Sequence, residues 1–447
     1  MSVAKPLKPK GEQSMETLRF DLSNKAGKFK VLNATNGGPW HKRHATDQLR
    51  SNFIDYKAAK FPYSRNHDSG LVSIYGGPYA HDISKIFRNF DADENDPASY
   101  DFACTDESLL CTLDAGTKIF FRLGETIEHQ IKKHAVIPPK DFHKWARICE
   151  HVIRHYNEGW ADGFNLGIEY WEIWNEPNLR PQCWTGNDEE FYDLYEITSK
   201  HLKSCFPNLK IGGPAVAGGE PDWTEPFLSE MRKRGVELDF FSWHRYAKEP
   251  SEIMDRAEEV QALLDKYGYS DTEHNINEWN YNRGWVEDFQ YSINAIHGIK
   301  GAAFVMATIS EGQRTECVDM MMYYDTRPSA FCGAFDFYSY EKLKSYYPLA
   351  WYGQNYYDLE SYIPQKNSVK NIYSLCGTDK DGKITCIVTH YSENDRTRTK
   401  RVKIDFGRDA KFEGYLVDSE HDADKIRIPK NLEFDMKCNS FILLKEI

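Results

Sequence analysis

The chain has 447 residues, of which 40% are hydrophobic and 28% charged, values typical of a globular protein. Its net charge of -12 and its lack of a long basic block argue against nucleic acid or an anionic membrane as the main partner, because both select for clustered Lys and Arg. No apolar run reaches the length needed to cross a membrane. A neutral or weakly charged substrate fits this composition better.

Residues 1–24 form a Lys- and Pro-rich tail, in which residues 17–22 are a possible strand. The tail lacks the apolar core of a signal peptide. We therefore expect a cytoplasmic protein, or a secreted or periplasmic one whose leader has been removed from this sequence. The ten cysteines show no CxxC pair and no regular spacing, which favours free and mostly buried thiols.

From residue 25 to residue 350, short apolar runs alternate with helix-like segments, a pattern typical of parallel strands covered by helices. Eight such units close into a (β/α)8 barrel, an α/β fold with right-handed connections. The eight predicted strands are residues 28–34, 61–67, 117–123, 168–174, 210–213, 239–244, 273–279 and 319–325.

Helical periodicity marks the segments between these strands. In residues 141–159, apolar side chains recur at steps of three and four, after two prolines and before Gly159. Residues 190–206 and 251–267 show the same pattern. Residues 90–102, rich in Asp, Asn and Pro, predict a long loop between the second and third strands.

After about Tyr357 the pattern changes to short strands separated by turns rich in Asp, Gly and Asn. We predict that residues 351–447 form a small β-sandwich domain, to which the strand in residues 17–22 could be added. Its main predicted strands are residues 369–375, 384–391, 401–406, 412–417 and 441–445.

Two carboxylates stand near the ends of predicted barrel strands. Glu176 follows the fourth strand within Trp174-Asn175-Glu176-Pro177, and Glu278 lies near the end of the seventh. Active sites of such barrels lie where the strands end, and strands four and seven face each other across the barrel mouth. Two carboxylates that face each other over a sugar are what glycosidic bond cleavage requires.

The sequence also resembles a known family. Trp-Asn-Glu-Pro after strand four, with a Glu near the end of strand seven, resembles clan A of the retaining glycoside hydrolases. Further motifs and the C-terminal sandwich resemble family 39, known for β-xylosidases and α-L-iduronidases. These motifs are Arg65-Asn66-His67-Asp68, Gly212-Gly213-Pro214-Ala215 and His244-Arg245-Tyr246.

The resemblance implies a role for each matching residue. Glu176 would be the general acid/base and Glu278 the nucleophile of a retaining mechanism, and Asn175 would bind the 2-hydroxyl of the sugar. His244, Tyr246, Arg65 and His67 would line the sugar site, and Trp279, beside the nucleophile, would bind the substrate with them. The nucleophile must be ionised, and hydrogen-bonding or cationic neighbours such as Tyr246 and Arg65 would lower the pKa of Glu278. Glu176 is expected to stay protonated as the acid.

The sequence departs from the β-xylosidase pattern where the sugar is selected. Trp279 replaces a Phe, and residues 281–285 and 320–325 match poorly. Arg283 could bind the carboxylate of an iduronide, whereas Asn178 is more like the xylosidase branch. We therefore expect a retaining, exo-acting, β-xylosidase-like enzyme. The alternatives are an α-L-iduronidase-like or other glycosidase of the same family, a transglycosylase, and a non-catalytic carbohydrate-binding protein.

Several residues allow a second interpretation. Glu172 is predicted to be a buried carboxylate paired with a barrel Arg rather than a catalytic group, and Arg65 could itself be a barrel-mouth salt bridge. His151 and His155 have the i, i+4 spacing of some metal ligands, but no third ligand is evident, so a solvated helix face is favoured. His41 and His44 could reach the sugar, with the odds against it. We expect no metal and no cofactor, and the oligomeric state is left open.

Overall fold

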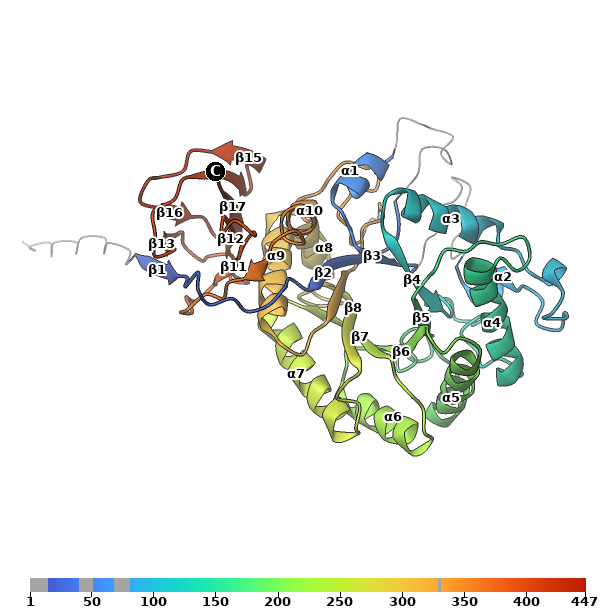
Figure 1. Cartoon of the computed structure of the whole chain (residues 1–447). Coiled ribbons are helices and arrows are strands. Elements are labelled where there is room, and N and C mark those ends of the chain that lie inside the picture. Colours follow the sequence, from blue (N-terminus) through green and yellow to red (C-terminus); the bar gives the residue numbers. More distant parts are fainter. Residues whose placement is uncertain (1–14, 40–50, 68–80, 329–330) are drawn as a thin grey trace, which may run out of the picture. The chain divides into compact units, whose positions relative to one another are not determined.

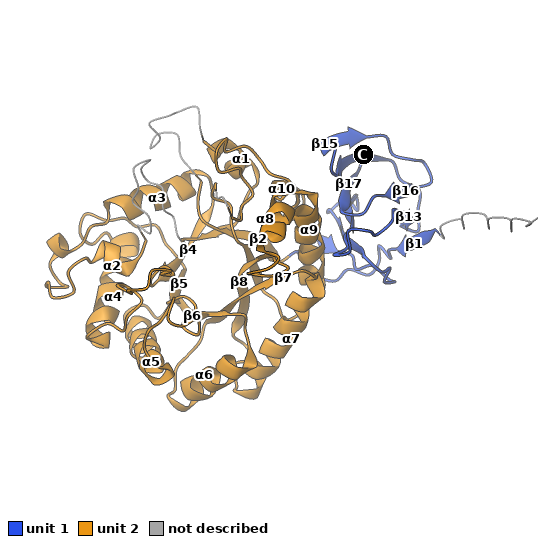
Figure 2. Ribbon diagram, turned by 180° about the vertical axis from the view of Figure 1, so that it is seen from behind, with its two compact units in different colours: residues 1–29, 358–447 blue, residues 30–357 orange. Residues whose placement is uncertain are grey.

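A computed structural model describes residues 15–39, 51–67, 81–328 and 331–447. His41 and His44 lie outside the described residues. The chain forms two compact units (Figure 2): Lys30–Tyr357 is one, and Met1–Phe29 with Asp358–Ile447 is the other. Within the described residues, no helix has the length and apolar character needed to span a membrane.

The larger unit is a closed barrel of eight parallel strands, which confirms the predicted (β/α)8 fold (Figure 1). Every strand pairs with its neighbour in sequence, and the last pairs with the first. All eight predicted strands are present. They are β2 (Val31–Asn36), β3 (Tyr63–Arg65), β4 (Lys118–Leu123), β5 (Tyr170–Ile173), β6 (Lys210–Ala217), β7 (Phe240–Ala247), β8 (Glu273–Tyr281) and β9 (Met320–Tyr323).

Helices surround these strands, and local signals set their ends. Asp141 caps α4 by accepting from the Lys144 N–H, and Gly159 ends it in the left-handed conformation, while Asn187 and Glu190 form a capping box on α5. The helices are α1 (Phe53–Ala58), α2 (Ile83–Ile86), the 3-10 helix η1 (Pro97–Ser99), α3 (Ala103–Asp114), α4 (Phe142–Glu158), α5 (Asp188–Cys205), α6 (Pro221–Lys233), α7 (Pro250–Lys266), α8 (Phe289–His297), α9 (Ile299–Arg314) and α10 (Tyr346–Asn355).

One prediction for α4 is wrong. His155 does not lie on a solvated face: it is buried and stacks on the ring of Phe102, with 3.6 Å between ring centroids. Its Nε2 lies 3.1 Å from a carboxylate oxygen of Asp106 on α3. The segment before α3 covers this face of α4, and a helical pattern alone does not reveal such a cover. His151 is half-buried and faces the Arg147 carbonyl of its own helix.

The barrel interior is built in layers along the strands. Near the strand starts, Phe120, Tyr170 and Phe240 belong to one apolar cluster. Side chains two residues further along a strand point to the same face, and there Glu172 lies beside Arg65 of β3. A buried polar layer therefore separates the apolar floor from the barrel mouth.

The smaller unit contains a three-stranded sheet (β1-β13-β16) and a six-stranded sheet (β10-β11-β12-β17-β14-β15), whose buried apolar side chains form one cluster. The strand β1 pairs in parallel with β13. Three strands here, β10, β15 and β16, were not predicted; β10 has two residues, and β15 buries none of its side chains. The strands are β1 (Glu16–Arg19), β10 (Ser361–Tyr362), β11 (Ile372–Thr378), β12 (Ile384–His390), β13 (Lys400–Asp405), β14 (Phe412–Val417), β15 (Asp422–Ile426), β16 (Glu433–Met436) and β17 (Ser440–Glu446).

Candidate active site

An unusual turn directs Glu176 into the barrel mouth. Trp174 and Glu176 have φ angles of 72° and 47°, a left-handed conformation that non-glycine residues seldom adopt. The turn is fixed from both sides, because the Trp174 N–H donates to the Leu123 carbonyl and the Glu176 N–H donates to the Ala215 carbonyl, at 2.7 and 2.9 Å. Such strain persists where the surroundings impose it, commonly at functional sites.

A register shift between β7 and β8 brings Glu278 to the same mouth. Ile276 pairs with Trp243 and Glu278 pairs with His244, so β8 contains one extra residue, Asn277, at this point. Bulges of this kind change the direction of the side chains that follow. Asn277 donates to Glu172 in the polar layer, and Glu278 reaches the cavity above.

The two carboxylates lie close together around His244. One oxygen of Glu176, one oxygen of Glu278 and a ring nitrogen of His244 all lie within 4.8 Å of one another. His244 Nδ1 is 2.8 Å from Glu176 Oε1 and 3.5 Å from Glu278 Oε2. Carboxyl groups are about 5 to 5.5 Å apart in retaining glycosidases and about 6.5 to 9.5 Å apart in inverting ones. One oxygen of Glu176 thus lies within 4.8 Å of one oxygen of Glu278, which makes them a close pair.

Cationic and hydrogen-bonding groups gather on Glu278. Burial opposes its ionisation, but His244, His67 and Arg65 and a 2.7 Å hydrogen bond donated by Tyr246 outweigh burial and hold the pKa of Glu278 below its usual range. Burial, together with the Glu278 charge, raises the pKa of Tyr246, so its hydroxyl stays a donor. Glu278 is therefore arranged to be a carboxylate, as a nucleophile must be.

Arg65 lies beneath the cavity and does not line it. Its side chain is fully buried, and its Nε donates to Glu172 Oε2 at 2.7 Å. This pair confirms the structural role predicted for Glu172. The other arm of Arg65 donates to Asn175 Oδ1 at 2.7 Å, and Nη1 lies 3.5 Å from Glu278 Oε2. Arg65 is thus a barrel salt bridge that also positions two groups of the site.

The bond to Arg65 fixes which end of the Asn175 amide faces the cavity. Because Oδ1 accepts from Arg65, Nδ2 is the remaining donor, and this buried atom has no hydrogen-bond partner among the described residues. His244 Nε2 is likewise buried and without a partner in the described part of the chain. A bound molecule with hydroxyl groups would satisfy both atoms.

A cavity of about 480 Å³ joins these groups, a size usual for small-molecule sites. Six residues predicted for the site line it: His67, Asn175, Glu176, His244, Tyr246 and Glu278. The other lining residues are Ile127, His129, Leu179, Ala217, Gly218, Trp285, Tyr324 and Phe331.

The expectation that Trp279 contacts the substrate does not hold in this structure, because Trp279 is not among the residues that line the cavity. It follows Glu278 on β8, so its side chain points to the opposite face of the strand. The ring is fully buried against Phe304 of α9 and Tyr323 of β9, with centroid distances of 6.4 and 5.8 Å. Trp279 therefore packs the barrel against its helices.

Sequence reasoning missed most of the cavity wall. Ile127, Leu179 and Phe331 lie in loops that follow strands, where no motif distinguishes one apolar residue from another. Trp285 could have been found, because it ends the run 281–285 that departs from the family pattern. Cys183 was also missed: its buried Sγ lies 3.7 Å from Glu176 Oε2.

Two residues considered for substrate selection have other contacts. The Arg283 guanidinium stacks on the ring of Tyr291, 3.7 Å from its centroid, and does not line the cavity. Asn178 exchanges two hydrogen bonds with the Ala217 backbone, at 2.8 and 2.9 Å, and so links the loop after β5 to β6.

Residues 41–327, more than half of the chain, match the model of glycosyl hydrolases family 39. The chain belongs to this family. It is 28% identical over 299 residues to a β-xylosidase from Geobacillus stearothermophilus, a match that covers 59% of this chain and 54% of that one. The chain thus spans about half the length of this relative.

Solved structures share the fold of this family 39 chain. A glucosidase from Croceicoccus marinus superimposes with a TM-score of 0.79 and 22% identity, covering 97% of this chain and 99% of the other. A monomeric β-xylosidase from Caulobacter crescentus gives a TM-score of 0.67 and 15% identity, with 96% and 99% covered. At these identities the likeness is one of fold.

Proposed function

We propose that the chain is a retaining glycoside hydrolase in which Glu278 is the nucleophile and Glu176 the general acid/base. The observation that carries this proposal is the asymmetry of the close carboxylate pair. Tyr246, Arg65, His67 and His244 contact the carboxylate of Glu278, whereas that of Glu176 has the shared His244 and the weakly polar thiol of Cys183. Different surroundings of two neighbouring carboxyls assign one as anion and the other as acid.

In the first step, a Glu278 oxygen attacks the anomeric carbon while Glu176 gives its proton to the leaving glycosidic oxygen. The bond to the aglycone breaks, and a glycosyl ester of Glu278 forms. In the second step, Glu176 takes a proton from a water molecule, whose oxygen attacks the same carbon. The ester bond breaks, the sugar leaves with its original anomeric configuration, and Glu176 holds its proton again.

Asn175 supports this chemistry as a sugar ligand. Arg65 holds its Oδ1, so Nδ2 can donate to a sugar hydroxyl in the cavity. A hydrogen bond to the 2-hydroxyl strengthens as the oxocarbenium-like transition state forms. The position of Asn175, next to the acid, suits that hydroxyl.

We infer that the substrate is a neutral, short glycoside, with a β-linked pentoside such as a xyloside the best candidate. Among the described residues that line the cavity there is no Lys or Arg to pair with the carboxylate of an iduronide. Arg283, which could have done so, contacts Tyr291 instead. A cavity of about 480 Å³ also suits exo-acting removal of one sugar better than binding of a long chain.

The test is a panel of aryl glycosides (xyloside, arabinosides, glucoside, galactoside and iduronide) followed by proton NMR of the first anomer released. We expect turnover of the β-xyloside and a β-anomer as first product. An α-anomer would overturn the retaining mechanism, and preference for the iduronide would overturn the neutral substrate. If oligosaccharides bind and no glycoside of the panel is hydrolysed over hours, the protein is a carbohydrate-binding one.

A further inference from the structure

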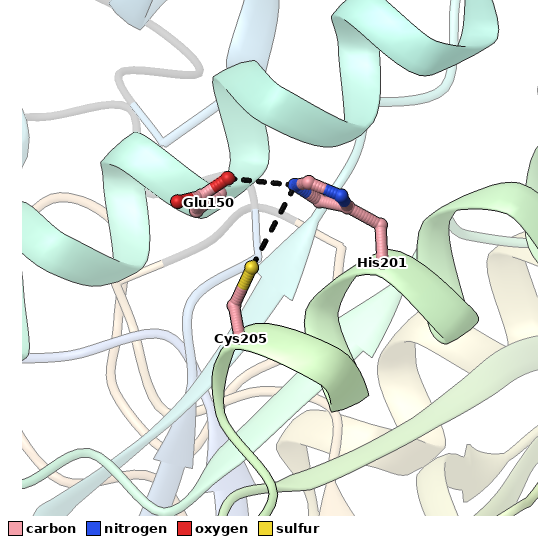
Figure 3. A group of neighbouring side chains, drawn as sticks. All are labelled: Glu150, His201 and Cys205. Atoms are coloured by element: carbon pink, nitrogen blue, oxygen red, sulfur yellow. Dashed lines mark hydrogen bonds and ion pairs between the residues drawn. The ribbon is translucent and has the colours of Figure 1, made fainter.

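A second group of polar side chains lies on the outside of the barrel, between helices α4 and α5. Glu150 of α4 faces His201 and Cys205 of α5 (Figure 3). Residues four apart on a helix share a face, so α5 presents an imidazole and a thiol together toward the carboxylate of its neighbour. All three side chains are partly exposed, which leaves the group open to solvent.

We propose that Glu150, His201 and Cys205 form a binding site for zinc or a similar transition-metal ion. One donor atom from each residue lies within 4.8 Å of the other two. Carboxylate oxygen, imidazole nitrogen and thiolate sulfur are the three donor types that zinc accepts, whereas calcium and magnesium prefer oxygen alone. The site gives three protein ligands and leaves the fourth tetrahedral position to water.

The distances require only small movements. His201 Nε2 is 3.9 Å from Cys205 Sγ and 2.7 Å from Glu150 Oε2. Around a tetrahedral zinc ion, a nitrogen and a sulfur ligand are about 3.6 Å apart, and a nitrogen and an oxygen ligand about 3.4 Å. The nitrogen–sulfur distance therefore has to shorten by about 0.3 Å and the nitrogen–oxygen distance to lengthen by about 0.7 Å, while the sulfur and oxygen donors lie within 4.8 Å of each other.

Neighbouring groups already orient the carboxylate. Arg154 Nε donates to Glu150 Oε1 at 2.8 Å, which leaves Oε2 directed at His201. Arg154 also pairs with Glu158 and stacks on Phe206. Its charge and its position therefore do not depend on Glu150 alone. Groups that hold a ligand in place from outside are a regular part of metal sites.

The charges balance when the ion binds. The thiol proton of Cys205 is released to solvent, and so is any proton between His201 Nε2 and Glu150, while neutral His201 keeps its remaining hydrogen on Nδ1. One thiolate and one carboxylate then neutralise a divalent ion. Binding should tighten as the pH rises, because protons are released.

A cobalt titration of the full chain tests the site. Cobalt(II) reports thiolate ligation through a sulfur-to-metal charge-transfer band, and zinc displaces it. We expect this band at one equivalent, and we expect zinc to raise the thermal midpoint of the apo protein. Cys205→Ser should abolish the band, and His201→Ala should weaken zinc binding more than about tenfold.

Two controls separate this site from others. Cys183 lies near Glu176, His244 and Glu278, which could also bind a metal, so Cys183→Ala must keep the band. Cys104→Ser, which removes an exposed thiol, must keep it too. Absence of a charge-transfer band in the wild-type chain, or its survival in Cys205→Ser, would overturn the proposal and leave Glu150 and His201 as a plain interhelical hydrogen bond.

Discussion

The hydroxyl of Tyr246 donates a 2.7 Å hydrogen bond to Oε1 of Glu278, across the neighbouring strands β7 and β8. This bond favours the carboxylate form of Glu278 and fixes the plane of its carboxyl group. Because Arg65, His67 and His244 contact the other oxygen, Oε2, both oxygens of Glu278 are held.

Tyr246→Phe should lower kcat/KM by about 10- to 100-fold, the loss of one hydrogen bond to a charged group. It should also move the acidic limb of the pH profile. The pKa of Glu278 is lowered in the native protein, and activity is lost as pH falls through that pKa. Removing a donor that favours the anion raises the pKa, so the limb shifts to higher pH. An unchanged limb would show that Tyr246 does not act on Glu278.

The two carboxylates should respond differently to removal. Glu278→Gln should reduce turnover of every glycoside by orders of magnitude, since no ester can form. Glu176→Ala should lower the turnover of alkyl glycosides by about 10²- to 10⁴-fold. Turnover of dinitrophenyl glycosides should fall much less, because their leaving groups need no proton. Azide should restore turnover of Glu176→Ala by attacking the glycosyl ester, giving a glycosyl azide of retained configuration. If the Glu278 variant instead showed the dependence on the leaving group and the rescue by azide, and the Glu176 variant were inactive on every glycoside, the two roles would be exchanged.

The buried pair of Arg65 and Glu172 should matter for folding as well as for the site. Glu172→Ala leaves the Arg65 charge buried without its main partner, which costs about 3 to 5 kcal/mol of unfolding free energy. All eleven tryptophans lie between residues 30 and 357, so tryptophan fluorescence in urea follows the barrel. The control is Asp91→Asn, which breaks the exposed pair with Lys140 and should cost less than about 1 kcal/mol. Equal losses of unfolding free energy in Glu172→Ala and Asp91→Asn would contradict the prediction.

His274 should make the barrel sensitive to acid. It is buried, and its Nε2 accepts a 2.7 Å hydrogen bond from the Trp243 indole. Burial lowers the pKa of His274 from 6.5 to about 3. Between these values the unfolded chain binds a proton that the folded chain does not, so stability falls as pH drops below about 6.5, by up to about 1.4 kcal/mol per unit. His274→Gln should show a shallower fall between pH 6 and 4 in urea titrations.

Substitutions of Trp285 and Trp279, which are close in sequence, should have different effects: one on substrate binding and the other on stability. Trp285 lines the cavity and is more than half exposed, and its ring lies 4.9 Å from that of Tyr246. Trp285→Ala should raise KM about 2- to 10-fold, the loss of one aromatic contact. Trp279→Phe should leave KM unchanged and lower the urea midpoint, since Trp279 fills the layer between β8 and α9. If Trp279→Phe changes KM, Trp279 contributes to substrate binding and the prediction is wrong.

The barrel strands could be predicted because each is a short apolar run between turn signals, and the two carboxylates because they stand near strand ends. The motif residues near them followed from the family resemblance. Trp279 was misjudged because closeness to Glu278 in the sequence was taken as closeness to the substrate, whereas consecutive side chains of a strand point to opposite faces. The cavity wall was missed because Leu179 and Ile127 are ordinary loop residues until folding brings the loops together.

Arg65 shows a different limit. The two interpretations of Arg65, sugar ligand and barrel salt bridge, differ by one layer of the barrel interior. The sequence does not indicate how deep in the barrel a side chain lies. The contacts with Glu172 and Asn175 place it below the cavity.

The pairing of β1 with β13 has a consequence for synthesis of the chain. Glu16 pairs with Val402, about 390 residues later. At about 5 to 20 residues per second, roughly 20 to 80 s pass on the ribosome before β1 can meet its partner. The whole segment Lys30–Tyr357 is made within that interval. The smaller unit, although it holds the first described strand, can therefore complete its fold only after the segment Lys30–Tyr357 has been made.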